Sequence, residues 1–218
     1  MIAIFTCCLL AFAIVVKAQD NDVVKQASYT TTITQRANKI VVVLGITDSS
    51  KFYRVQTIIV QQYRNLSAIH DSLNAKIKAT KASGADKESI ATMVKTIEDD
   101  RMVQLAKCHQ LYITKLTAEL LPEQVIKVKD GMTYSILPIT NKAYQEMLPT
   151  LTEQQKAQII NYLTEAREYA MDAESSDKKH AWFGKYKGKI NNYLSAAGID
   201  MKKAGQEWEE RIKAAKAN

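Results

Sequence analysis

Helix breakers are rare in this chain, and their rarity constrains the fold more than any other feature. Only three prolines and seven glycines occur among its 218 residues. The long stretches between them carry apolar residues three and four positions apart, which is the period of an amphipathic helix. The sequence therefore predicts an all-α fold, an antiparallel bundle of about six to eight helices.

Turn and capping residues divide this bundle into its expected helices. Gly45 and Gly198 suit left-handed helix ends, and Asp48 or Ser49 can cap the helix that follows Gly45. The helix from 49 should be the antiparallel partner of the helix that begins near residue 86. Helices are predicted over about 23–44, 49–81, 86–116, 138–149, 152–171, 180–197 and from 200 onward.

Residues 122–136 allow two interpretations. The alternating pattern around the Asp-Gly pair at 130–131 is typical of a β-hairpin. Pro122, however, stands where a first helical residue would stand, and Asp-Gly would then be the stop of a short helix that ends at Lys129. We expect the helix, followed by an extended segment over 132–136.

The chain start is typical of a secretory signal peptide. Residues 2–16 are apolar and uncharged, and they fall short of the ~20 residues that a membrane-spanning helix needs. Val16 and Ala18 supply small residues for cleavage after Ala18. We expect a signal peptide over 1–18 and a single helical domain over 19–218, with export to the periplasm or the extracellular space. A retained membrane anchor is the alternative.

Cysteine, histidine and charge usage narrow the function. Cys108 is the only cysteine after residue 18, so no internal disulfide is expected and its thiol should lie in the core. No histidine pair has metal-ligand spacing, so we expect neither a metal nor a cofactor. The net charge of +7 favours anionic partners. For an exported protein these are acidic polysaccharides, other anionic polymers or phospholipid head groups, with no nucleic acid and no stable membrane insertion after signal removal.

Residues 180–200, HAWFGKYKGKINNYLSAAGID, show three stripes on a helix. One stripe, which includes Phe183, Tyr186 and Ile190, should pack into the bundle. A second stripe is small and includes Gly184 and Gly188. Glycine costs a helix about 1 kcal/mol relative to alanine, so close packing of a neighbouring helix is expected there, with a ligand as the alternative.

The third stripe holds Trp182, Lys185, Lys189 and Asn192. An aromatic ring beside lysines can stack on a sugar and meet its carboxylates or sulfates, although a solvated basic face is the simpler alternative. The preceding helix, expected to be antiparallel, presents Glu165, Glu168 and Asp172 on one face, either as partners of the basic row or as acid and base groups. No catalytic residue is assigned. The candidate ligand-binding residues are Trp182, Lys185, Tyr186, Lys189, Asn192, Arg167 and Glu168.

Four segments carry a family resemblance: KIVVVLGITD (39–48), QYRNLSAIHD (62–71), EAREYAMD (165–172) and FGKYKGKINNYLS (183–195). With them the mature chain resembles a secreted family of Bacteroidetes, the domain of unknown function DUF3826, which is sometimes described as sugar-binding. The resemblance implies export and a role with carbohydrate. A weaker similarity links LTEQQ (151–155), with a partial copy at 120–124, to the Leu-Thr-x-x-Gln motif of periplasmic Spy-type chaperones.

These observations lead to one main functional expectation and two alternatives. We expect an exported, non-enzymatic protein that binds carbohydrate, with acidic glycans favoured. The alternatives are a periplasmic Spy-like chaperone and an accessory enzyme of polysaccharide breakdown that uses clustered carboxylates.

Overall fold

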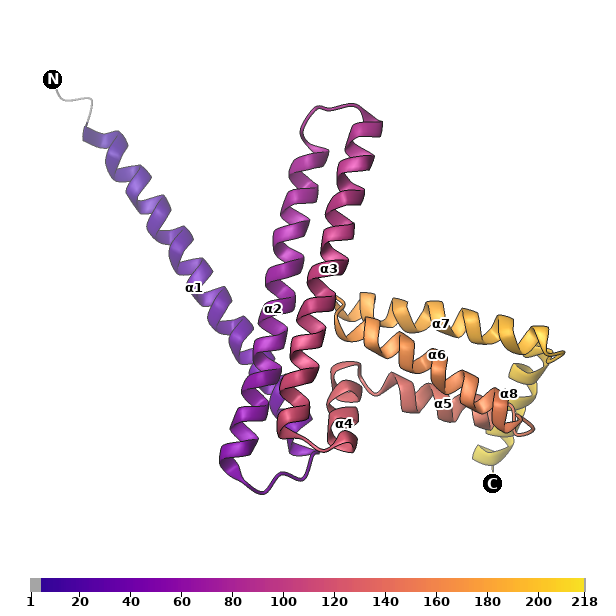
Figure 1. Cartoon of the computed structure of the whole chain (residues 1–218). Helices are drawn as coiled ribbons and strands as arrows, with labels where there is room; N and C mark the ends of the chain where they lie inside the picture. The colour runs from indigo at the N-terminus through magenta and orange to yellow at the C-terminus, as the bar shows by residue number, and fades with distance from the viewer. Residues whose placement is uncertain (1–4, 218) are drawn as a thin grey trace. The chain divides into compact units, whose positions relative to one another are not determined.

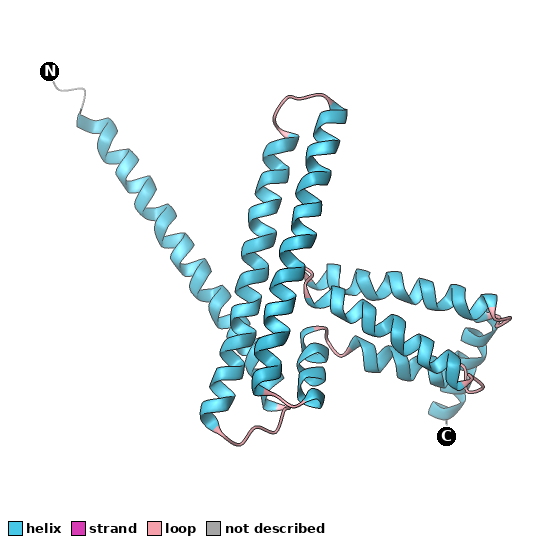
Figure 2. Cartoon of the chain, viewed as in Figure 1, coloured by secondary structure: helices cyan, strands magenta, loops and turns pink. Residues whose placement is uncertain are grey.

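The structure is a computed structural model that describes the backbone of residues 5–217 and the side chains of 24–216. Its described residues form eight helices and no strand (Figure 2), which confirms the predicted all-α fold. None of these helices is both long and apolar enough to cross a bilayer. The chain forms two compact units, Met1–Tyr63 and Arg64–Asn218, which are described separately.

The N-terminal unit, Met1–Tyr63, contains helix α1 (Phe5–Val42) and the first part of α2 (Ser49–Lys81). The chain reverses between them at Gly45, whose φ of +69° is the left-handed conformation expected of it. Asp48 caps α2, because its Oδ1 accepts a hydrogen bond from the Ser50 N–H at 2.8 Å. The predicted signal peptide, 1–18, lies outside the residues whose side chains are described, so it stays a prediction.

The C-terminal unit, Arg64–Asn218, begins with the rest of α2 and with α3 (Lys87–Glu119). Asp86 caps α3, and its carboxylate accepts hydrogen bonds from two N–H groups of the first turn. The two helices run side by side (Figure 1), and Arg101 NH2 donates across to Asn74 Oδ1 at 2.8 Å. The predicted antiparallel pairing of these helices is confirmed.

Residues 122–136 form a helix and not a hairpin. Helix α4 (Pro122–Met132) begins at the proline as expected, but it runs through the Asp-Gly pair. It ends where the Asp130 carbonyl accepts hydrogen bonds from the Thr133 and Ser135 N–H groups, with Tyr134 and Ser135 at φ of 58° and 54°. The extended segment predicted for 132–136 is therefore wrong, because this left-handed turn leads directly into α5 (Ile136–Met147).

Helices α5, α6 (Glu153–Met171), α7 (Ser176–Ala196) and α8 (Met201–Ala217) share one apolar core. The α6 helix starts with the predicted capping box: Gln155 N donates to Thr152 Oγ1 at 3.2 Å, and Thr152 N donates to Gln155 Oε1 at 2.9 Å. The short turn after α6 makes α7 its antiparallel neighbour (Figure 1). The fully buried side chains of this core include Ile159, Leu163, Phe183, Ile190 and Leu194.

The glycines of α7 do not serve the close packing that the sequence suggested. Gly184 and Gly188 are exposed, and a Cβ atom added to either would meet nothing within 4 Å. The Phe183 and Tyr186 stripe turns toward α6 instead, which leaves the small stripe on another side of the helix. The expectation of a helix packed against these glycines is wrong.

Candidate functional site

A pocket of about 590 Å³ opens in the C-terminal unit where α3, the end of α6 and the start of α7 meet. The α2 helix adds His70 to its lining, and the turn after α6 adds Glu174. The other lining side chains are of two kinds, an apolar and aromatic set and a set that is charged or, at Gln110, polar. The apolar and aromatic set is Met102, Leu105, Ala106, Tyr169, Ala173 and Trp182.

The aromatic wall is a stacked pair. Tyr169 of α6 and Trp182 of α7 lie with ring centroids 4.6 Å apart and an interplanar angle of 15°. Tyr186, which is not part of the lining, has its ring centroid 6.4 Å from that of Tyr169. Lys185 Nζ sits 5.0 Å from the centroid of Trp182, and Lys189 Nζ sits 4.1 Å from that of Tyr186. The lysines of the basic stripe therefore lie against the rings.

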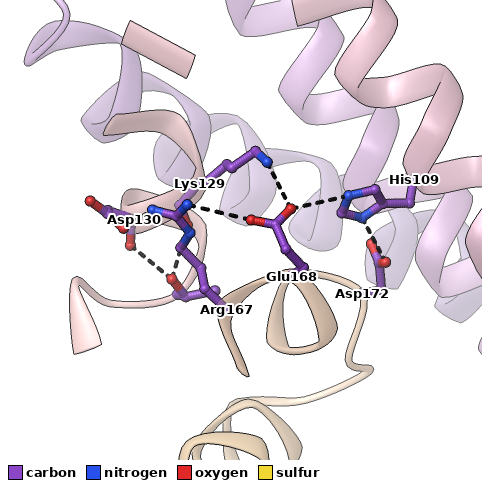
Figure 3. Close-up of polar contacts among 7 residues, drawn as sticks. His109, Lys129, Asp130, Arg167, Glu168 and Asp172 are labelled. Carbon is purple, nitrogen blue, oxygen red and sulfur yellow. Dashed lines mark hydrogen bonds and ion pairs between the residues drawn. The ribbon is translucent and has the colours of Figure 1, made fainter. Parts of the chain in front are cut away.

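A polar cluster forms the next part of the wall and joins α3, α4 and α6 (Figure 3). His109 of α3 lies between two carboxylates, with Nδ1 2.8 Å from Asp172 Oδ2 and Nε2 3.3 Å from Glu168 Oε2. Lys129 of α4 donates to the same Glu168 oxygen at 2.7 Å. Since a carboxylate oxygen accepts, both ring nitrogens of His109 donate, and the ring is an imidazolium.

Hydrogen bonding and charge set the protonation of this cluster. The hydrogen bonds to Asp172 and Glu168 raise the pKa of His109 to about 9, despite the opposing effect of burial. Burial alone would raise the pKa of Glu168, but hydrogen bonds from His109 and Lys129 outweigh it and hold that pKa at about 2. Both groups are therefore charged near neutral pH.

A second polar cluster adjoins the first. His70 Nε2 donates to the backbone carbonyl of Asp172 at 2.8 Å, and its Nδ1 lies 3.3 Å from Arg101 NH1. The Arg101 guanidinium also contacts Glu98 at 3.1 Å and Glu174 at 3.7 Å. Arg101 lines the pocket, and its guanidinium already has several partners within the protein.

The structure separates the candidate ligand-binding residues into three groups. Trp182 and Glu168 line the pocket. Lys185, Lys189 and Asn192 are exposed, but they are not part of its lining.

The third group is buried. Arg167 is only 6% exposed and donates from NH1 to Asp130 Oδ1 at 2.8 Å, and Tyr186 is 2% exposed in the bundle core. Both side chains are therefore largely enclosed by the protein, and their role in ligand binding stays a prediction. Glu165, expected to share a face with Glu168 and Asp172, lies beside the Tyr186 hydroxyl.

Sequence reasoning missed the histidines of the site. It treated His70 and His109 as scattered, yet both converge on Asp172, the residue that ends α6. The residue numbers of His109 and Asp172 differ by 63, so no local pattern links them. Within the described residues, no group of three or more His, Cys, Asp or Glu side chains is arranged to hold a metal ion.

Comparison with known proteins adds a family. No curated protein matches the chain. A family model described as "Protein of unknown function (DUF3826)" matches residues 30–214, a range that includes every residue of the pocket. This match covers most of the chain, and the protein therefore belongs to the DUF3826 family.

Proposed function

We propose that this protein binds carbohydrate without transforming it and that the pocket beside Trp182 is the binding site. The observation that carries the proposal is the composition of the pocket, in which a stacked aromatic pair faces clustered, ion-paired polar groups. Its volume, about 590 Å³, is in the range of small-molecule sites. Export to the periplasm or the extracellular space, expected from the chain start, belongs to the same proposal.

The aromatic pair supplies an apolar surface for the C–H groups of a sugar ring. Tyr169 is 39% exposed although it is stacked on Trp182, so part of this surface meets solvent. Burial of aromatic area is favourable in proportion to the area removed from water, and rings that already pack against each other lose little freedom on binding.

The charged groups supply directional hydrogen bonds. Glu168 and Asp172 offer carboxylate oxygens that accept, and Arg101 offers guanidinium N–H groups that donate. His109, whose two N–H groups are already bonded, holds both carboxylates in place. Sugar hydroxyl groups both donate and accept. A pocket whose lining contains both acceptors and donors therefore suits a polyhydroxylated ligand.

Loss of the tryptophan ring tests this proposal. The full chain is applied to an array of neutral and acidic glycans, and the affinity for the strongest binder is measured by calorimetry for wild type and Trp182→Ala. We expect the variant to bind at least about tenfold more weakly, a loss of roughly 1.4 kcal/mol or more, because it lacks the stacking surface.

The other tryptophan, Trp208 of α8, is a matched control, since it is partly buried and lies outside the pocket. Trp208→Ala should keep wild-type affinity, and circular dichroism should show both variants folded. No binding to any glycan by the folded wild type would refute the proposal. Equal losses of glycan affinity in the two variants would indicate that the glycan does not bind in the pocket.

The charge state of Glu168 weighs against its use as the general acid of a glycosidase. A glycosidase needs one protonated carboxyl as general acid, with its pKa raised. Glu168 has the opposite shift, because His109 and Lys129 stabilise its carboxylate form. The second alternative, a Spy-like chaperone, rests on LTEQQ (151–155), and the capping box of α6 accounts for Thr152 and Gln155 in that motif.

A further inference from the structure

We propose that the pocket selects an uncharged sugar and discriminates against acidic glycans, although the overall charge of the protein favours anions. This inference rests on the proposed carbohydrate-binding function and specifies its ligand class. Three features of the pocket lead to it: a balanced set of charges, cations that already have partners, and an acceptor atom without a donor.

The charges of the site cancel. The lining contains four carboxylates, and its cations are Arg101, Lys178 and the His109 imidazolium. Lys129, which is outside the lining and contacts Glu168 at 2.7 Å, supplies a fourth positive charge. With the His70 ring left out of the count, the site has no excess positive charge that would compensate an incoming carboxylate or sulfate. The four lining carboxylates are Glu98, Glu168, Asp172 and Glu174.

The cations within the pocket are engaged by these carboxylates. Arg101 contacts Glu98 and Glu174, and its NH2 donates to Asn74. His109 uses both of its ring nitrogens on Glu168 and Asp172. An anionic ligand would have to take one of these cations from a resident carboxylate and would leave that carboxylate uncompensated at a partly buried site. Lys178, exposed at the rim, is the remaining cation of the lining.

One acceptor in the wall has no donor. Asp172 Oδ1 is enclosed and has no hydrogen-bond partner among the described residues, while Oδ2 of the same carboxylate bonds to His109. The Asp172 side chain keeps 14% exposure and lines the pocket, so a small rotation of the carboxylate would bring Oδ1 to a ligand. A sugar hydroxyl has a proton to donate to this oxygen, whereas an ionised carboxylate or sulfate has none.

Sugar pairs that differ in one group test this selectivity. Glucose and galactose oligomers are compared with the matching glucuronate and galacturonate oligomers, which carry a carboxylate where the neutral sugar has a CH₂OH group. Affinities for the full chain are measured by calorimetry at pH 7 and at 0.05 and 0.5 M NaCl. We expect the neutral member of the pair that binds to have at least tenfold higher affinity and to change less than twofold with salt.

A Lys178→Gln variant removes the one exposed cation of the lining. The acidic member should bind this variant no more tightly than it binds wild type, and the neutral member should still bind more tightly than the acidic one. Tighter binding of the acidic member, lost in Lys178→Gln or at high salt, would overturn the inference but leave carbohydrate binding in place. No binding to either member of any pair, or to any arrayed glycan, would overturn the proposed function and the inference together.

Discussion

Gly184 and Gly188 were expected to pack against a neighbouring helix, but the structure shows no close contact at either residue. Both lie inside α7, and neither has a positive φ, since the glycines with positive φ are Gly45, Gly84 and Gly198. Each lowers helix stability by about 1 kcal/mol relative to alanine, and no close contact in the structure offsets that loss. At these positions an alanine methyl group would point into open space.

Gly188→Ala should therefore stabilise the protein. We expect a gain of about 0.5–1 kcal/mol, which for a chain of this size raises Tm by roughly 1–4 °C. Thermal melts followed by circular dichroism measure the change. Gly198→Ala serves as the control and should lower Tm, because φ is +86° there and alanine is strained in that region. A lower Tm for Gly188→Ala would indicate that another surface contacts this face of α7.

At the scale of elements, three helices meet in one ion-paired cluster. His109 comes from α3, Lys129 from α4, and Glu168 and Asp172 from the end of α6. Removal of one partner leaves a partly buried charge without compensation, and this costs more than the pair contributes. The cluster should therefore make the association of these helices depend on pH.

The sign of this dependence follows from the two shifted pKa values. The pKa of His109 rises from 6.5 to about 9 on folding, so its contribution is complete below pH 6.5 and is lost as pH rises through 9. The pKa of Glu168 falls from 4.5 to about 2, so its contribution is present above pH 4.5 and is lost as pH falls through 2. Between pH 4.5 and 6.5 the cluster stabilises the fold most.

Urea unfolding at pH 6 and pH 10 measures the alkaline part of this dependence. We expect wild type to lose roughly 1–2 kcal/mol between the two values from His109, a figure reduced for partial exposure of the ring. His109→Gln should be less stable than wild type at pH 6 and should show a smaller loss toward pH 10. An identical loss in both proteins would assign the dependence to other groups.

The elements differ in how far the sequence predicts them. The starts of α3 and α6 follow from Asp86 and from the Thr152 and Gln155 pair, because a capping residue bonds within its own turn. The end of α4 was misplaced by three residues, since Tyr134 adopts a left-handed conformation that sequence patterns assign to glycine. The sequence proposed Trp182 as a ligand-binding residue from its place beside lysines on α7, and the structure places it in the pocket lining. Its partner Tyr169 and the histidines of the pocket were not proposed, because contacts between distant helices leave no local pattern.

At the scale of the whole molecule, the charge of the protein differs from the charge of the pocket. The chain carries a net charge of +7, whereas the charges at the pocket cancel. Exposed lysines on α7 and α8, among them Lys189 and Lys202, lie outside the pocket lining. The net charge acts at long range and is screened over about 10 Å at 0.1 M salt, so it attracts polyanions without selecting them.

Retention on a heparin column should therefore be independent of the pocket. We expect wild type to bind at 0.05 M NaCl and to elute by about 0.5 M NaCl, because screened surface charge gives salt-sensitive attraction. Trp182→Ala should elute at the same salt concentration, since it keeps every charge, although it loses the neutral sugar. A double variant, Lys189→Gln with Lys202→Gln, should elute earlier and bind the neutral sugar as wild type does. If Trp182→Ala alone abolished retention, the polyanion would bind at the pocket. The inference that polyanions bind the exposed lysines and that only neutral sugars bind the pocket would then be wrong.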